Sequence, residues 1–284
     1  MTVSALDRKV VLITGGGGGL GSATAVECAA RGARVVLLDR DAAALARAAE
    51  TIGAAATTYV LDVTDARACA DVVARVVGEF GRIDIVWANA GVSVFGPVDL
   101  LDDRAWQQVN EVNLIGAHNI VRAALPAVIE SRGYVAMTCS WASFAHQPGH
   151  TAYAAAKAGL EAFANSLRTE LAGTGVEVGS YHPGWIDTTM VTSKLGQQAF
   201  AALLQSLPGP FGSVSTTAAI VPHLTRALES RSRRMIHPRA GWVLLLARTA
   251  LPTRLLTRRS RMVAPTIRRL STREAGAPAM TPQE

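Results

Sequence analysis

Cysteine is scarce in this sequence. Only Cys28, Cys69 and Cys139 occur among 284 residues. Three thiols so widely separated neither form a disulfide framework nor match the spacing of a zinc site. We therefore expect a protein of a reducing, cytoplasmic compartment that holds no metal ion.

Long apolar runs are also lacking. No stretch of about 18 uninterrupted apolar residues occurs, which argues against a transmembrane helix. Residues 1–7 are mostly polar and lead directly into a strand-like run, so the layout of a signal peptide is missing. These features predict a protein that is neither exported nor membrane-spanning.

An excess of positive charge is lacking from most of the chain. The formal net charge is +6, but residues 226–284 contain thirteen arginines and three acidic residues. This C-terminal part therefore carries +10, which leaves −4 for residues 1–225. A nucleic-acid-binding domain usually presents a basic folded face to the phosphate backbone. An acidic body with a basic tail does not have that charge distribution, so we expect no nucleic-acid partner.

The first two thirds of the chain alternate β-branched runs with longer alanine-rich stretches. This alternation is typical of βαβ units, and the continuous apolar character of the runs indicates strands covered on both faces. The expected strands span residues 10–14, 34–39, 57–62, 83–88, 134–139, 176–181 and 234–238. The expected helices span residues 20–31, 42–51, 66–80, 102–130, 151–173 and 216–230. We predict a Rossmann-type, doubly wound α/β domain over residues 1–238, with a central parallel sheet of about seven strands.

A run of glycines follows the first expected strand and opens the first expected helix. The sequence there is Thr14-Gly15-Gly16-Gly17-Gly18-Gly19-Leu20-Gly21. Glycine permits a tight turn and lets backbone amides approach a pyrophosphate, whose charge the N-terminus of the following helix also stabilises. A flexible linker has the same composition, but the position between a strand and a helix favours dinucleotide binding.

Asp39 ends the second expected strand, about 20 residues beyond the glycine run. A carboxylate there can accept hydrogen bonds from both ribose hydroxyls and repels a 2′-phosphate. Asp39 could instead cap the following helix, because Asp39-Arg40-Asp41 directly precedes it. Arg40 could attract a 2′-phosphate. Weighing these effects, we expect NAD to be preferred over NADP.

Tyr153 and Lys157 lie four residues apart in an expected helix, so their side chains share one face. An ammonium beside a phenol favours the phenolate and lowers the pKa of the phenol, which an acid/base for alcohol oxidation requires. Exposed helices carry such pairs by chance, so the pair gains its meaning from the motifs around it.

Several motifs, in this order and at this spacing, resemble the short-chain dehydrogenase/reductase family over about residues 9–238. They are the glycine run, Asp62-Val63, Asn89-Ala90-Gly91, Val112-Asn113, Ser140 thirteen residues before Tyr153, the Tyr153 and Lys157 pair, and Pro183-Gly184 followed by Thr188. Chance is a poor explanation for so many matches.

The resemblance implies a role for each matching residue. Tyr153 would donate or accept the proton, Ser140 would hydrogen-bond the reacting oxygen, and Lys157 would tune Tyr153 and hold the nicotinamide ribose. Asn113 would anchor a water in a proton relay to Lys157. The implied cofactor-binding residues are Gly15, Gly19, Leu20, Gly21, Asp39, Arg40, Asp62, Val63, Asn89, Ala90, Gly91, Tyr153, Lys157, Pro183, Gly184, Ile186 and Thr188. A homo-oligomer of at least two subunits, built around the helices at 102–130 and 151–173, is implied as well.

Ala88 departs from the family pattern, which has an asparagine at this position before Asn89. That asparagine mainly supports the sheet in the family. Its replacement therefore bears on local stability more than on catalysis.

A cysteine and three histidines lie near the expected active site. Cys139 could be a reactive thiol, but we expect a small buried hydrophobic residue. His146, His150 and His182 are too irregularly spaced for a metal site. One of them could contact substrate, and the sequence does not say which.

Residues 188–213 are rich in glycine and proline and predict a mobile loop with a short helix inside it. The loop has several large apolar side chains, namely Met190, Val191, Leu195, Phe200, Leu203 and Leu204. They indicate an apolar substrate, or else they form the helix that packs the loop shut.

Residues 239–273 form a basic, partly apolar extension beyond the resemblance. A helical projection after Pro252 places one apolar set, Leu255, Leu256, Met262 and Val263, on one broad face and Arg254, Arg258 and Arg261 on another. Arg259 falls on the apolar side, so the amphipathic pattern is imperfect. The extension either packs over the core or a partner subunit, or it docks weakly on an anionic membrane surface. Residues 274–284 contain two prolines and few apolar residues, which predicts a disordered tail.

Together these features predict an NAD(P)(H)-dependent oxidoreductase that interconverts a secondary alcohol and a ketone on an apolar substrate. One alternative is a membrane-surface enzyme for a lipid or steroid-like alcohol. Another is a noncatalytic nucleotide-binding regulator. The complete set of Asn113, Ser140, Tyr153 and Lys157 argues against a regulator, because binding alone needs no acid/base group.

Overall fold

The computed structural model describes residues 4–253 and 257–276. Its centre is one parallel sheet in the strand order β3-β2-β1-β4-β5-β6-β7. The strands are β1 (Val10–Thr14), β2 (Arg34–Asp39), β3 (Ala56–Val60), β4 (Ile85–Ala88), β5 (Tyr134–Thr138), β6 (Glu177–Pro183) and β7 (Arg234–His237). This sheet confirms the predicted Rossmann-type, doubly wound fold.

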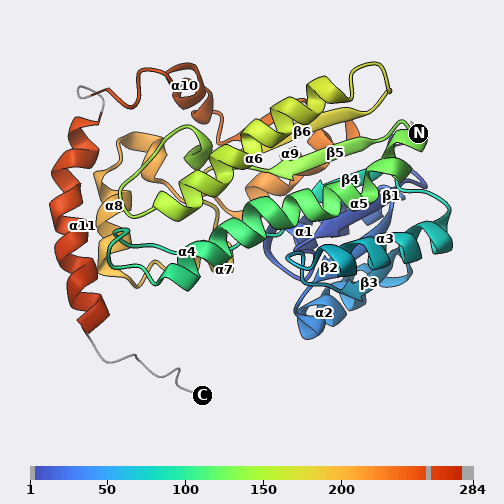
Figure 1. The fold of residues 1–284 in the computed structure, drawn as a ribbon, viewed down its shortest axis with the longest axis horizontal. Coiled ribbons are helices and arrows are strands. Elements are labelled where there is room, and N and C mark those ends of the chain that lie inside the picture. The colour runs from blue at the N-terminus through green and yellow to red at the C-terminus, as the bar shows by residue number, and fades with distance from the viewer. Residues whose placement is uncertain (1–3, 254–256, 277–284) are drawn as a thin grey trace.

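Helices cover both faces of the sheet (Figure 1). One face carries α3 (Ala66–Phe80), α5 (Ala117–Glu130) and α6 (Thr151–Glu170), and the other carries α1 (Gly19–Ala30), α2 (Ala42–Ile52) and α9 (Thr217–Glu229). The further helices of the described residues are α4 (Asp103–Asn110), α7 (Thr189–Thr192), α8 (Gln198–Ser206), α10 (Gly241–Leu246) and α11 (Arg258–Gly276). Shorter turns are η1 (Gly53–Ala55), η3 (Trp141–Ser143) and η4 (Gly209–Gly212), with a π-helical turn at η2 (Glu111–Gly116).

Strand β1 shows why the strands read as nearly continuous apolar runs. Val10 and Leu12 pack toward α3, α5 and α6, whereas Val11 and Ile13 pack toward α1, α2 and α9. All four side chains are buried. Successive side chains of a strand point to opposite faces, so a sheet covered on both sides has no solvent-facing row.

Side-chain caps set the starts of several helices. Asp41, Asp65 and Asp102 each accept a hydrogen bond from a backbone amide in the first turn of α2, α3 and α4, and Thr216 does so for α9. These residues satisfy amides that have no partner within the helix. The predicted starts of α2 and α3, at residues 42 and 66, are confirmed.

The long helix expected over residues 102–130 is divided into α4, the π turn η2 and α5. By length and composition alone this 28-residue stretch could cross a membrane. In the fold, Ile120, Val121, Ala124 and Val128 lie buried against the sheet and α3. The stretch is therefore a core helix of the domain.

Residues 188–213 contain more regular structure than the expected loop with one short helix. They form α7, α8 and the η4 turn. The sequence of this region alone does not reveal the cause, because α8 is covered by a helix from the other end of the chain. Ala199 and Leu203 of α8 pack against Ile267 of α11.

The C-terminal extension packs on the domain rather than standing apart from it. In Figure 1, α11 runs beside α8, and α10 lies above α6. Leu245 of α10 is buried against Trp141 and Ile236. In α11, Val263, Ile267 and Leu270 face α8, at the helical spacing of one stripe.

The predicted helical projection of this extension is wrong in one respect. Met262 was expected on the apolar face with Val263, but it is 71% exposed. The contact with α8 is centred on Ile267, which turns Met262 toward solvent. The expected faces at Arg254, Leu255 and Leu256 lie outside the described residues.

The tail expected to be disordered from residue 274 begins later than that. Residues 274–276 are the last residues of α11. Glu274 has a tertiary contact there, because its Oε1 accepts a hydrogen bond of 2.6 Å from the Gln198 amide. The rest of the expected tail, residues 277–284, lies outside the described residues.

Several arginines of the basic extension and of β7 have carboxylate partners. Arg234 and Arg248 both reach Oε1 of Glu161, which is buried, at 3.1 Å. Arg268 pairs with Asp99, in the loop between β4 and α4. Part of the +10 charge thus serves to attach the extension to the acidic body.

Candidate active site

The carboxyl ends of β1 and β4 meet at the point where the strand order reverses. The loops after these two strands diverge there, and such switch points form ligand crevices in open α/β sheets. A cavity of about 320 Å³ opens at this position and is lined by the loops after β1, β4, β5 and β6. We call it the cofactor cavity.

The glycine run forms the floor of the cofactor cavity by a turn that needs glycine. Gly15 adopts φ of +65°, and a Cβ on Gly21 would lie 2.1 Å from the Gly15 carbonyl oxygen. Gly19 has φ of +54° and lies at the start of α1. Backbone amides and the N-terminus of α1 are therefore free of side chains on the cavity side.

Asp39 lies beside the glycine run. Its Oδ2 accepts a hydrogen bond of 3.0 Å from the Gly17 amide, and the residue lines the cofactor cavity. The N-cap of α2 is Asp41, not Asp39. The capping alternative for Asp39 is therefore wrong.

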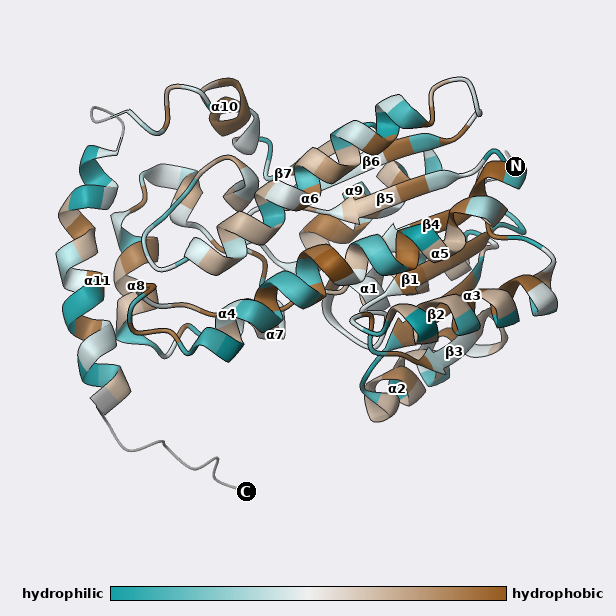
Figure 2. Cartoon of the chain, viewed as in Figure 1, coloured by the Kyte–Doolittle hydropathy of each residue, from teal (hydrophilic) through white to brown (hydrophobic). Residues whose placement is uncertain are grey.

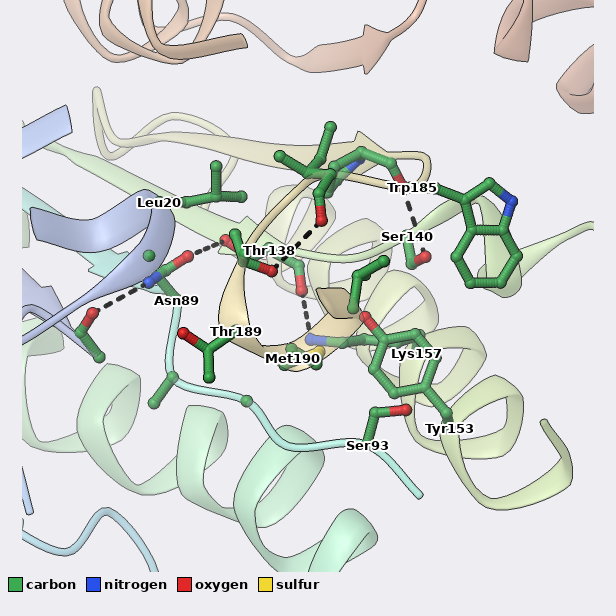
Figure 3. A pocket seen from close by; sticks show the side chains of 18 of the residues that line it. Leu20, Asn89, Ser93, Thr138, Ser140, Tyr153, Lys157, Trp185, Thr189 and Met190 are labelled. Atoms are coloured by element: carbon green, nitrogen blue, oxygen red, sulfur yellow. Dashed lines mark hydrogen bonds between the residues drawn. The ribbon is translucent and has the colours of Figure 1, made fainter. Parts of the chain in front are cut away.

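A polar network behind the cavity joins β1, β4 and β5. The Asn89 side-chain amide donates to the Thr14 carbonyl at 3.1 Å, and Oδ1 of Asn89 accepts from the Thr138 hydroxyl at 3.0 Å. The indole of Trp87 donates to Thr138 Oγ1 at 2.9 Å. Figure 3 shows Asn89 and Thr138 in this network. Ala88, where the family has asparagine, is simply buried in β4.

Ser140, Tyr153 and Lys157 converge at the inner end of the cofactor cavity (Figure 3). Ser140 follows β5, and Tyr153 and Lys157 lie one turn apart on α6. The Lys157 ammonium donates to the Thr138 carbonyl at 2.6 Å and lies 5.6 Å from the centre of the Tyr153 ring. The Ser140 hydroxyl donates to the Pro183 carbonyl at 3.4 Å.

The pKa of the phenol differs from the sequence-based expectation. Burial raises the pKa of Tyr153 to about 12, although a hydrogen bond with Ser140 opposes the shift. Burial also lowers the pKa of Lys157 to about 8. The expected lowering of the Tyr153 pKa by Lys157 is absent, because the ammonium is directed at the Thr138 carbonyl and desolvation dominates both groups.

Asn113 lies in the π turn η2 and is completely buried. Its side chain donates to the Val92 carbonyl at 2.8 Å and accepts from the Val92 amide at 2.9 Å. A Cβ on Gly91 would lie 2.6 Å from Asn113 Oδ1 and 3.5 Å from Lys157 Nζ. Asn113 thus fixes the loop after β4 close to Lys157, and π turns frequently occur at functional sites.

The structure gathers most of the expected cofactor residues around one cavity. Its lining includes Gly15, Gly19, Leu20, Asp39, Asn89, Ala90, Gly91, Tyr153, Lys157, Pro183, Gly184, Ile186 and Thr188. The other expected residues, Gly21, Arg40, Asp62, Val63 and Asn113, do not belong to that lining.

Asp62 and Val63 follow β3, which ends at Val60, two residues before the expected end. Asp62 is exposed and accepts hydrogen bonds from the amide and hydroxyl of Thr64, which lower the pKa of its carboxyl. Val63 is buried beside α5, and its carbonyl accepts from Asn119 at 3.0 Å. The hydrogen bonds of Asp62 and Val63 are thus made to Thr64 and Asn119 of the same domain.

Several lining residues were not identified from the sequence. They are Ser93, Thr138, Trp185, Thr189 and Lys194, together with Met190, Val191 and Phe200, which were considered only as loop residues. Trp185 directly follows the Pro183-Gly184 motif, so its position was available as a signal. Lys194 belongs to no motif of the sequence; it is buried in the fold, where its ammonium donates to the Met190 carbonyl at 2.6 Å.

The histidines have different surroundings. His146 and His150 line a second cavity, and His150 lines the cofactor cavity as well. His182 is buried in β6, with Nδ1 3.2 Å from the Ser140 carbonyl and Nε2 3.1 Å from the Ser180 hydroxyl. Cys139 is completely buried, and burial raises the pKa of its thiol to about 12, which confirms a packing residue.

The second cavity, which we call the distal cavity, has a volume of about 520 Å³. It shares Ser140, Tyr153 and Trp185 with the cofactor cavity. From there it extends along η3, the η4 turn and the C-terminal extension. Ser140 and Tyr153 therefore stand where a glycine-lined cavity meets a larger, mainly apolar one.

The parallel sheet, the glycine turn and the Ser140, Tyr153 and Lys157 group define a dinucleotide-dependent oxidoreductase. The family model for short chain dehydrogenases matches residues 9–199, and the chain belongs to this family. It is thus an enzyme that acts on CH–OH groups with a nicotinamide cofactor.

Curated relatives agree with this assignment. The 3-oxoacyl-[acyl-carrier-protein] reductase FabG of Thermotoga maritima is 35% identical over 221 residues, which cover 76% of this chain and 89% of the relative. An uncharacterized NAD-dependent oxidoreductase of Mycobacterium tuberculosis is 35% identical over 214 residues, covering 69% of this chain and 78% of the relative. The crystal structure of gox2181 has a TM-score of 0.75 at 24% identity, covers 82% of this chain and 95% of its own, and shows the fold.

Proposed function

We propose that this enzyme interconverts an apolar secondary alcohol and its ketone, prefers NAD(H) to NADP(H), and works in the cytoplasm. The carrying observation is the position of Ser140 and Tyr153 at the junction of the cofactor cavity and the distal cavity. Chemistry between a nicotinamide ring and a substrate carbon requires such a junction, because the two molecules must meet at the acid/base group.

The residues of the cofactor cavity fit a nicotinamide dinucleotide. The glycine turn leaves backbone amides at the N-terminus of α1 accessible to a pyrophosphate, and Gly19 at the start of that helix has φ of +54°, which favours glycine. Asp39 would hold the adenosine ribose, and Lys157 the nicotinamide ribose. The bound cofactor supplies or accepts the hydride.

In the reductive direction, the Tyr153 hydroxyl donates its proton to the carbonyl oxygen of the substrate, and the Ser140 hydroxyl donates a hydrogen bond to the same oxygen. In the oxidative direction, the Tyr153 oxygen accepts the alcohol proton. With its raised pKa, Tyr153 carries the proton at neutral pH that it donates in the reductive direction. Asn113 fixes the loop beside Lys157, from which a proton can be resupplied.

The preference for NAD rests on the placement of Asp39. Its carboxylate lies against the Gly17 amide on the cavity lining, whereas Arg40 is exposed and does not line the cavity. A 2′-phosphate on the adenosine ribose would meet the negative charge first.

The apolar character of the substrate is supported by the distal cavity. Its walls include Trp141, Leu207, Phe211, Leu244 and Leu251. The rings of Trp141 and Phe211 pack edge to face with centroids 5.9 Å apart. Apolar walls of this kind with a few polar groups near the reacting atoms are typical of small-molecule sites.

The test is a panel of secondary alcohols and ketones, read by the absorbance of the reduced nicotinamide with NAD and with NADP. We expect turnover of apolar members and a loss of at least about 10²-fold in Tyr153→Phe, because that variant lacks only the transferable proton. Retained NADH binding in Tyr153→Phe is the control for folding. A parent protein that binds NADH but turns over no member would instead indicate a nucleotide-binding regulator.

A second candidate is an enzyme that works at a membrane surface. It is favoured by α10, where Trp242, Val243 and Leu246 are exposed beside the basic extension. Figure 2 shows this short helix as a hydrophobic segment at the upper edge of the molecule. Salt-sensitive cosedimentation with anionic vesicles, abolished in a Trp242→Ser, Leu246→Ser double variant, would support it. Absence of binding at low salt would exclude it.

A further inference from the structure

The far end of the distal cavity is formed by the C-terminal extension, outside the matched family region. Leu244, Leu251 and Pro252 supply apolar wall, and Thr257, Arg259 and Ser260 lie at the start of α11. The family match ends at residue 199. This part of the cavity wall therefore lies outside the region that the family model matches.

Charge is distributed unevenly along the distal cavity. Among its described lining residues, Arg259 alone has a permanent charge, and none is acidic. At the inner end, burial lowers the pKa of His150 to about 4 and raises that of Tyr153 to about 12, so both groups are uncharged at neutral pH. The distal cavity thus has uncharged groups at Tyr153 and His150, apolar walls, and one cationic side chain at Arg259.

Contacts on both sides fix the first turns of α11 at the cavity. Ser260 donates a hydrogen bond of 3.0 Å to Oε1 of Gln147, in the loop before α6. Further along the helix, Ile267 is buried against α8, and Arg268 pairs with Asp99. Arg259 is therefore attached to a well-anchored helix, although its own side chain is exposed at the cavity mouth.

We propose that the substrate is an elongated, largely apolar alcohol or ketone with an anionic group remote from the reacting carbon, and that Arg259 binds this group. The inference rests on the proposed function and adds the chemical class of the substrate. A guanidinium forms charge-assisted hydrogen bonds with carboxylates and phosphates, and no acidic lining residue of the described chain competes for it. The volume of about 520 Å³ is in the range that holds a ligand of this size.

The experiment compares straight-chain oxo-carboxylic acids of graded length with their methyl esters, using the full chain and NADH. Acid and ester differ in charge but not in the reacting ketone. We expect the acid to have a higher kcat/KM, by roughly threefold to fivefold, the upper part of the range for an ion pair at a solvent-exposed position. The preference should appear only above the chain length that reaches from Tyr153 to Arg259, and it should lie mainly in KM.

Two variants and a control assign the effect to Arg259. Arg259→Gln should reduce kcat/KM for the acid to the value for the ester and leave the ester within about twofold of the parent. Arg259→Glu should reverse the preference. Arg261→Gln removes the same charge from an exposed position on the same helix that does not line the cavity, and it should leave the preference unchanged.

The outcomes separate this proposal from the proposed function. Turnover of the esters without any preference for the acids would refute the proposed anionic group of the substrate and leave the alcohol and ketone chemistry intact. An equal loss of kcat/KM for the acid in Arg259→Gln and Arg261→Gln would have the same meaning. A preference for oxo-phosphonates over oxo-carboxylates would support anion binding by Arg259 and would indicate that the natural anionic group is a phosphate or phosphonate. No turnover of any ketone would overturn both proposals.

Discussion

At the scale of single residues, the site combines buried groups whose charges are suppressed. Tyr153, Lys157, His150 and His182 all have a pKa displaced toward the neutral form by burial. For His182 the hydrogen bonds agree with this: Nδ1–H donates to the Ser140 carbonyl, so Nε2 accepts from the Ser180 hydroxyl. The Ser180 hydroxyl can donate to Nε2, so the neutral imidazole satisfies both partners.

The pH dependence of turnover follows from Tyr153. Oxidation needs the unprotonated tyrosine oxygen, and a pKa of about 12 means that its fraction grows as the pH rises. We expect kcat/KM for alcohol oxidation to increase steadily from pH 6 to pH 10. Carbonyl reduction uses the protonated phenol and should not decline through loss of that proton over the same range. A maximum for oxidation below pH 7 would contradict this assignment.

The pH dependence of stability follows from His150 and His182, with pKa values lowered to about 4 and about 3. The unfolded chain takes up protons on these residues near pH 6.5, and the folded chain does so only below about pH 4. The free energy of unfolding should therefore fall as the pH decreases from 7 to 4, by roughly 2 to 4 kcal/mol per histidine. Urea unfolding at several pH values measures the slope, and a smaller slope in His182→Gln would assign its share.

Cofactor choice is a further property of one residue. Asp39→Ser removes the charge beside the Gly17 amide and leaves a hydroxyl that can still bond a ribose. We expect the ratio of kcat/KM for NAD over NADP to fall by about tenfold, since the repulsion of a 2′-phosphate is lost. Asp41→Ser preserves an N-cap for α2 and is the matched control. A parent that prefers NADP would show that Arg40 outweighs Asp39.

At the scale of elements, α8 and α11 depend on one another. Glu274 accepts hydrogen bonds from the backbone amides of Gln198 and Ala199, the first two residues of α8. It thus caps α8 from 76 residues away in sequence. Phe200, in the same helix, lines the cofactor cavity. Through Glu274, α11 therefore supports a helix that forms part of the active-site wall.

Removal of this tertiary cap tests the dependence. Glu274→Ala leaves two amides at the start of α8 without an acceptor, which should cost about 1 kcal/mol and lower Tm by about 2 to 4 °C. KM for the substrate should rise more than kcat falls. Glu50→Ala, an exposed carboxylate on α2, is the control. Equal changes of Tm and KM in the two variants would mean that the Glu274 contact stabilises neither α8 nor the active-site wall.

At the scale of the whole molecule, we predict a homo-oligomer built around α4, α5 and α6. The exposed apolar residues Trp106, Ile115 and Ile129 lie along the α4 to α5 stretch, where a partner subunit would cover them. Light scattering at micromolar concentration should give at least a dimer, and Ile115→Arg should weaken it. Val60→Arg, exposed on the edge strand β3, is the control. A monomeric parent would refute the prediction.

The sequence by itself predicted the fold class and the glycine turn, and its resemblance to the family implied the Asn113, Ser140, Tyr153 and Lys157 set. The first two features depend on local sequence: continuous β-branched apolar runs specify strands covered on both faces, and a glycine run between a strand and a helix specifies the turn. The tertiary structure alone decided the direction of the Tyr153 pKa, the exposure of Met262, and the joining of Arg259 to the distal cavity. Each of these depends on which distant segments pack beside a side chain and which leave it in solvent. Burial by α11 and the sheet is a property of three-dimensional packing, which no local spacing records.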